Sequence, residues 1–216
     1  MSSTFSNRPR ADARKPVRKS AQERYELLLD ATDRVLADGL NEDVSLAQIA
    51  AVAEVPLASV YHFFPNRNAA FVALAQRFHA ELRHLASQPH QPLPGTWQDM
   101  VAMNQRRAAA YLNARPAALR LFMGAGVSVQ VRNTDMMGNA ALTRMRVDQF
   151  NQLFDMPRVP DLELRLAVSL AVSEGVWTLS YSAHERITDA FIEESVRASV
   201  SYLRCFLPEF VPLRTV

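Results

Sequence analysis

The chain has 216 residues, of which 49% are hydrophobic, so it can bury a substantial core in one or two domains. It contains only six glycines and few alternating apolar runs, which favours an all-α protein over a β-rich one. The single cysteine, Cys205, excludes an intrachain disulfide. The polar, basic N-terminus lacks the pattern of a signal peptide, and no apolar run is long enough to cross a bilayer. We therefore expect a cytoplasmic protein without a membrane partner.

The net charge of +2 conceals a strong asymmetry along the chain. Residues 1–20 hold six basic side chains and one acidic side chain, whereas residues 21–67 hold three basic and eight acidic ones. We interpret residues 1–19 as a flexible basic arm that binds phosphates through Arg14, Lys15, Arg18 and Lys19. The alternative is a solvated tail without a binding role.

The elements that follow are predicted to be helices. The first helix begins at Ser20, where Glu23 completes a capping box, and ends near Gly39. Residues 45–64 then have the pattern of two short helices joined by a tight turn, a helix-turn-helix that can place its second helix in a DNA major groove.

Local signals support the two short helices. Ser45 followed by Gln48 is a capping box that fixes where the first of them begins. Pro56 stands at the start of the second, where its missing N–H costs nothing. Glu54 occupies the turn, where the backbone favours positive φ and glycine is usual, so the turn is expected to be strained by about 1 kcal/mol.

Further helices are predicted to the end of the chain. Asn66 caps a fourth helix, and the proline-rich residues 88–95 form the clearest break. Residues 127–131 look β-like but are isolated, so we interpret them as a loop or a helix extension. The later helices are expected at 96–113, from Arg115 to an interruption at 124–126, at 133–155, at 161–185 and from 188 to Pro208, giving about nine helices in all.

The stretch VSLAQIAAVAEVPLASVYHFFPNRNAAF, residues 44–71, resembles the signature of the tetracycline-repressor (TetR) family of transcriptional regulators. Three positions, Glu54, Pro56 and Ala58, depart from the family's usual glycine, serine and glycine. The resemblance implies a DNA-binding domain over residues 20–80 and a helical ligand-binding and dimerisation domain over residues 81–216. The matching residues are Ile49, Ala50, Ala53, Tyr61, His62, Phe64 and Arg67.

Candidate DNA contacts follow from the outer face of the second short helix and from the resemblance. Ser59 and His62 can hydrogen-bond base edges or phosphates, and apolar side chains can contact a thymine methyl. Tyr61 is interpreted as a phosphate hydrogen bonder, with a core-edge aromatic as the equal alternative. The full set is Ser45, Pro56, Leu57, Ala58, Ser59, Tyr61, His62 and Arg67, together with the four arm residues.

The body is rich in methionine and aromatic residues, which suit a pocket for varied apolar ligands, although ordinary core is the simpler interpretation of each residue. Its last two helices are candidates for a dimer interface, because the helix over 161–185 is apolar nearly all round. The candidate ligand residues are Met100, Asn104, Arg107, Phe122, Met123, Met137, Phe150, Glu174, Trp177 and Tyr181. The candidate dimer residues are Ile192, Ser195, Val196, Ser199, Val200 and Leu203.

These observations predict a homodimeric repressor that binds a near-palindromic double-stranded operator and is released by an apolar or amphipathic small molecule. A helical protein–protein adaptor is the alternative. A small helical enzyme is less favoured, because the sequence has no nucleophile elbow, no metal-spaced His/Cys set and no phosphate-binding glycine loop. We expect no cofactor and no metal.

Overall fold

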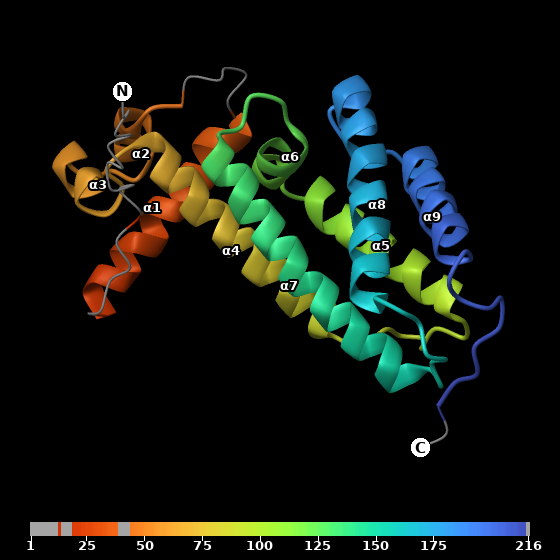
Figure 1. The fold of residues 1–216 in the computed structure, drawn as a ribbon. Coiled ribbons are helices and arrows are strands. Elements are labelled where there is room, and N and C mark those ends of the chain that lie inside the picture. The colour runs from red at the N-terminus through yellow and green to blue at the C-terminus, as the bar shows by residue number, and fades with distance from the viewer. Residues whose placement is uncertain (1–12, 14–18, 39–43, 215–216) are drawn as a thin grey trace, which may run out of the picture. The chain divides into compact units, whose positions relative to one another are not determined.

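A computed structural model describes residues 13, 19–38 and 44–214 (Figure 1). These residues form nine α-helices and no β-strand, which confirms the predicted all-α class. Arg14, Lys15 and Arg18 of the predicted arm lie outside the described residues. The helices are α1 (Lys19–Asp38), α2 (Leu46–Val52), α3 (Leu57–Phe63), α4 (Arg67–Ser87), α5 (Trp97–Asn113), α6 (Pro116–Met123), α7 (Val129–Leu153), α8 (Leu162–His184) and α9 (Asp189–Leu203).

Two helix boundaries differ from the sequence prediction for local reasons. The β-like residues 127–131 lead into α7 because the Ser128 hydroxyl accepts a hydrogen bond from the Val131 N–H at 3.2 Å and caps the helix there. The last helix ends at Leu203 rather than at Pro208. The residues after it form a tail, from which the Pro208 carbonyl accepts a hydrogen bond from the Trp97 indole at 2.9 Å.

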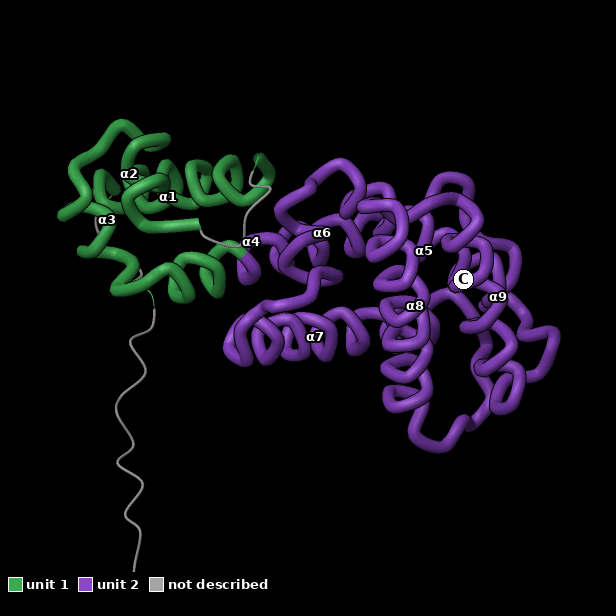
Figure 2. Tube along the Cα trace, turned by 90° about the horizontal axis from the view of Figure 1, so that it is seen from above, with its two compact units in different colours: residues 1–74 green, residues 75–216 purple. Residues whose placement is uncertain are grey.

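The described chain divides into two compact units, residues 1–74 and residues 75–216, drawn in green and purple in Figure 2. The boundary falls inside α4, whereas the DNA-binding domain is predicted to end at residue 80. Since α4 is one continuous helix, its first two turns belong to unit 1 and the rest of it belongs to unit 2.

Unit 1 is built around aromatic and aliphatic side chains from α1, α2 and α3. The Tyr25 ring of α1 lies 5.9 Å from the ring of Phe63 and 5.5 Å from that of Phe64, measured between centroids. Ile49 and Val60 are fully buried in the same unit. Burial of this set fixes how α2 and α3 are held against α1.

A hydrophobic core of unit 2 joins α5, α7, α8 and α9 with the tail that follows α9. Trp97, Phe154 and Leu203 are fully buried in it, and Val211 brings the tail into the same cluster. The tail is also held by backbone hydrogen bonds, such as that from the Arg214 N–H to the Leu153 carbonyl at 2.8 Å. Within the part of the chain that the structure describes, no single helix is long and apolar enough to cross a membrane.

Candidate DNA-binding surface

Helices α2 and α3 form the predicted helix-turn-helix, bent by 115° relative to each other. The capping box at the start of α2 is present: the Ser45 N–H donates to Gln48 Oε1 at 2.7 Å, and the Gln48 N–H donates to Ser45 Oγ at 3.2 Å. The turn passes through Glu54 with φ of 54°, so a non-glycine residue holds the left-handed conformation that the sequence predicted. The Val55 N–H then donates to the Ala50 carbonyl at 3.0 Å and closes the turn.

Helix α3 presents one face to solvent and buries the other. Val60 and Phe63 point into the core of unit 1. Tyr61 is 55% exposed, so it is not a core-edge aromatic in this chain. The remaining predicted contacts on and before α3 are accessible: Pro56, Leu57, Ala58 and His62 are exposed, and Ser59 is half-buried.

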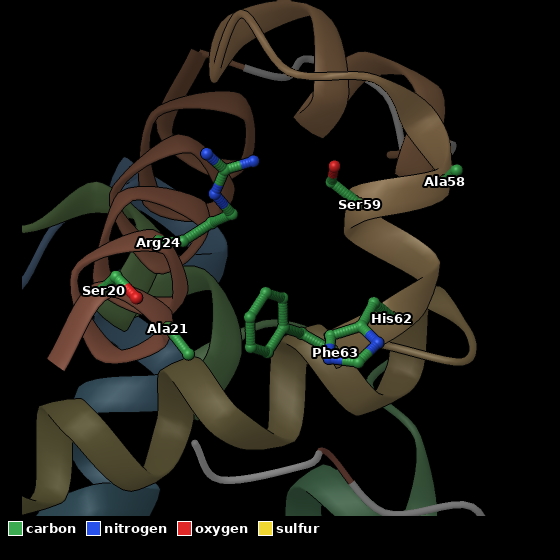
Figure 3. A pocket seen from close by; sticks show the side chains of 7 residues that line it. All are labelled: Ser20, Ala21, Arg24, Ala58, Ser59, His62 and Phe63. Carbon is green, nitrogen blue, oxygen red and sulfur yellow. The ribbon is translucent and has the colours of Figure 1, made fainter. Parts of the chain in front are cut away.

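A cleft of about 520 Å³ separates the polar face of α3 from the start of α1. Figure 3 shows the Arg24 side chain extending from α1 into this space, toward the side on which Ser59 lies, with His62 further along α3. Ser59 and His62 are thus brought together with a basic group from another helix. The lining residues are Ser20, Ala21, Arg24, Ala58, Ser59, His62 and Phe63.

Arg24 was not among the residues predicted to contact DNA. Its surroundings in the sequence are acidic, and no motif marks it. Its neighbour Tyr25 packs on Phe63, which turns the adjacent face of α1 toward α3. The placement depends on this tertiary contact, so a helical pattern alone does not reveal it.

The other predicted DNA residues are placed at the edges of unit 1. Lys19 is exposed at the start of α1. Ser45, the N-cap residue of α2, is half-buried. Arg67 is exposed and donates to the Val44 carbonyl at 3.4 Å, while its guanidinium carbon lies 5.8 Å from the centre of the Phe71 ring. Arg67 therefore also ties the start of α4 to the segment before α2.

Two predicted ligand residues in unit 2 instead fasten the loop between α4 and α5. Arg107 donates to the Gln88 carbonyl at 2.8 Å and contacts His90 Nδ1 at 2.7 Å. Because a guanidinium has no acceptor, His90 Nδ1 accepts this bond and His90 Nε2–H donates to Asn104 Oδ1 at 2.9 Å. Burial lowers the pKa of His90, which favours the neutral ring that this pattern requires.

Five of the other predicted ligand residues are dispersed over unit 2. Met100 and Phe150 belong to the core cluster of unit 2, and Met137 is exposed on α7. The Trp177 indole donates to Ser195 Oγ at 3.0 Å, which ties α8 to α9, and Tyr181 is half-buried.

The other three, Phe122, Met123 and Glu174, lie near one another. Thr178, one turn along α8 from Glu174, donates to Met123 Sδ at 3.6 Å, and the Phe122 ring lies 4.7 Å from the ring of His79.

Most of the predicted dimer residues lie inside the chain's own core. Ser195 and Ser199 are fully buried and hydrogen-bonded to Gln105 of α5 at 2.7 and 2.8 Å, because the inner stripe of α9 packs on α5 and α8. The set Ile192, Ser195, Ser199, Val200 and Leu203 is buried, and Val196 is half-buried. These residues therefore offer little surface to a second copy, which corrects the assignment of the interface to them.

Helix α8 has an exposed stripe of small and apolar side chains instead. Leu164 is 52% exposed and Leu179 is 64% exposed. Ala171 and Gly175 lie between them on the same face and are exposed as well. We call these four residues the α8 stripe.

No family model and no curated protein matches the sequence. Solved structures do match. A TetR-family regulator from Streptomyces coelicolor is 18% identical, covers 85% of this chain and 80% of its own, and has a TM-score of 0.64. A TetR regulator from Rhodococcus sp. RHA1 is 18% identical, with coverage of 86% and 98% and a TM-score of 0.63. SmeT, the repressor of the Stenotrophomonas maltophilia multidrug efflux pump SmeDEF, is 17% identical, with coverage of 90% and 96% and a TM-score of 0.60. The chain therefore has the fold of the TetR-family transcriptional regulators.

Proposed function

We propose that this chain is a DNA-binding transcriptional regulator that inserts α3 into the major groove. The observation that carries the proposal is the exposed face of α3, mounted on a 115° helix-turn-helix with Arg24 beside it. The likeness in fold to SmeT and the other TetR-family structures supports it.

The side chains on α3 suit distinct contacts. Ser59 and His62 can hydrogen-bond base edges, and the apolar Leu57 can contact a thymine methyl. Tyr61, exposed at the outer side of the helix, can donate to a phosphate. Arg24 is one of three basic side chains among the eight acidic ones of residues 21–67, which suits it to a phosphate contact.

We further propose that the regulator is a homodimeric, ligand-responsive repressor. Two copies of α3 are needed for a near-palindromic operator, and the α8 stripe is the accessible apolar surface through which two copies can associate. SmeT is a repressor, and the same role for this chain is part of the proposal. Release by a ligand requires that the ligand binds one conformation more tightly than the other, typically by 1–3 kcal/mol.

Selection from a library of random DNA duplexes tests the proposal. The purified chain is expected to enrich a near-palindrome with half-sites about one helical turn apart or slightly more. An Arg24→Ala variant is expected to bind the enriched duplex more weakly and to lower the slope of log affinity against log salt by about 1, since one phosphate contact is lost. Lack of any enriched sequence at low salt would contradict the DNA-binding function and leave the protein–protein adaptor as the better interpretation.

A further inference from the structure

Unit 2 contains a group of hydrogen-bonded polar side chains outside the DNA-binding surface, of which His79 and Asp135 are buried, Asn139 and Glu174 half-buried and Arg132 exposed. His79 of α4 contacts Asp135 of α7, with Nε2 to Oδ1 at 3.0 Å, and both side chains are almost fully buried. Arg132 donates to the other oxygen of Asp135 at 3.2 Å. Asn139, one turn further along α7, donates to Glu174 Oε1 of α8 at 2.7 Å. We call these five residues the polar cluster.

His79 is held tightly on one side of the polar cluster. A methyl group at Gly138 would stand 2.2 Å from ring atoms of His79, so the ring rests directly on the α7 backbone. The Phe122 ring of α6 lies 4.7 Å away on another side. The two carboxylate oxygens of Asp135 therefore contact His79 and Arg132, which offset the cost of burying its negative charge.

The cost of burying the negative charge of Glu174 is offset less well. Burial and the negative charge of Asp135 raise the pKa of Glu174 to about 7, against the opposing effects of the Asn139 hydrogen bond and of the Arg146 and Arg132 charges. Arg146, whose own pKa is lowered by burial, acts on Glu174 less strongly than Asp135 does. The ionised carboxylate thus stands in a region where a further positive charge would be favourable.

The surroundings of Glu174 fit an amphipathic molecule. The residue keeps partial exposure, and its carboxyl group accepts a hydrogen bond from Asn139 of α7 at 2.7 Å. An apolar side chain lies beside this part of α8: Thr178, one turn along from Glu174, donates to Met123 Sδ at 3.6 Å. A few convergent polar groups beside apolar side chains are typical of a small-molecule site.

We propose that Glu174 is the polar anchor of the effector site and that the effector carries a protonated amine on an apolar body. This inference rests on the proposed ligand-responsive function and specifies the chemistry of its effector. An amine at Glu174 supplies the further positive charge that the carboxylate favours, and the apolar part of the molecule lies beside Met123. A carboxylate effector is disfavoured at the same place because Asp135 and Glu174 are both acidic.

The position of the polar cluster connects this site to α4. A cation beside Glu174 also attracts Asp135, which holds His79 of α4. Because α4 continues into unit 1, a change in the Asp135–His79 contact acts on the helix that follows the helix-turn-helix.

Calorimetric titration of the whole protein with three molecules of equal chain length tests the anchor: dodecylamine, 1-dodecanol and dodecanoate, each below its micelle concentration. Dodecylamine is expected to bind most tightly. Glu174→Gln is expected to weaken dodecylamine binding about tenfold to a hundredfold, the loss expected for a charge-assisted hydrogen bond, and to leave 1-dodecanol binding unchanged. The matched control is Glu163→Gln, an exposed glutamate on the same helix, which is expected to change nothing.

The pH dependence gives a second readout. Between pH 8 and pH 6 the amine stays protonated while Glu174 gains a proton, so dodecylamine affinity for the wild-type protein is expected to fall about tenfold. Glu174→Gln is expected to abolish this dependence. Equal dodecylamine affinity in wild type and Glu174→Gln, or dodecanoate binding as tight as that of dodecylamine, would overturn the proposal.

Duplex binding without amine separates this inference from the proposed function. Wild-type protein that binds dodecylamine through Glu174 but binds no DNA would contradict the regulator while supporting the amine site. Protein that binds DNA but shows no preference for dodecylamine would contradict the amine site alone.

Discussion

Two glutamates in this chain lie where glutamate is energetically unfavourable. One is in the turn of the helix-turn-helix, and the other is in the proposed effector site. Glu54 holds a φ of 54° at the turn between α2 and α3, a conformation that favours glycine. Glu174 is half-buried in unit 2, and its pKa is raised to about 7. The first is a cost of local backbone geometry, whereas the second is a cost of charge burial that a ligand can offset.

Glu54→Gly is expected to stabilise the protein by about 1 kcal/mol, because glycine adopts this φ without a steric penalty. The measurement is urea unfolding followed by circular dichroism. Ala51→Gly, an exposed position in the last turn of α2, is the control and is expected to destabilise by about 1 kcal/mol. A Glu54→Gly variant that is less stable than the wild type would show that the turn is not strained.

Glu174→Gln is expected to change how stability depends on pH. The folded state raises the pKa of Glu174 from 4.5 to about 7, so the folded protein binds more protons than the unfolded chain between these values. Wild-type stability should therefore fall as pH rises from about 4.5 to 7, by at most about 3 kcal/mol. In the variant, the free energy of unfolding should not show this decrease. If the free energy of unfolding depended on pH in the same way in both proteins, the raised pKa would be contradicted.

At the scale of elements, the contact between α4 and α7 depends on a missing side chain. Gly138 lets the His79 ring lie against the α7 backbone, where the ring reaches Asp135. A helix interior normally disfavours glycine by about 1 kcal/mol, so its use here is explained by the space that the imidazole needs.

Gly138→Ala is expected to destabilise the protein by about 1–3 kcal/mol, because the new methyl overlaps the His79 ring. The cost should vanish when His79→Ala is combined with it, since the ring is then gone. A double-mutant cycle measured by urea unfolding checks this coupling. Additive effects of the two substitutions would contradict the direct contact.

The sequence predicts elements of this fold better than it predicts their mutual contacts. The capping box at Ser45 and the left-handed turn at Glu54 were predicted because both are set by a few neighbouring residues. Arg24 was not predicted, since its placement depends on which face of α1 its neighbours cover. The helix over 161–185 was predicted as an interface candidate, but the exposed residues of the α8 stripe were not named for the same reason. The predicted dimer residues failed for the same reason: the apolar stripe of α9 is real, but it is used within the chain.

At the scale of the whole molecule, the proposed regulator needs two copies. The α8 stripe combines exposed leucines with Ala171 and Gly175, whose small side chains allow a second helix to approach closely. In this chain a Cβ added at Gly175 would meet nothing within 4 Å, so the position is free to accept a partner.

Leu179→Arg is expected to convert the protein from dimer to monomer, because it places a charge within an apolar contact. Sedimentation equilibrium gives the mass directly. Ser201→Arg, at an exposed position of α9, is the control and should remain dimeric. A Leu179→Arg variant that keeps the wild-type mass would exclude the α8 stripe as the interface.

The central claim, that α3 reads DNA sequence, is tested most directly by the ratio of affinities for the selected duplex and a scrambled duplex at one salt concentration. Fluorescence anisotropy is expected to give a ratio of about 10³ or more for the wild type. The Ser59→Ala/His62→Ala variant is expected to lose most of this ratio while retaining weak binding to the scrambled duplex. A wild-type ratio near one, or a ratio that the double variant leaves unchanged, would contradict the account.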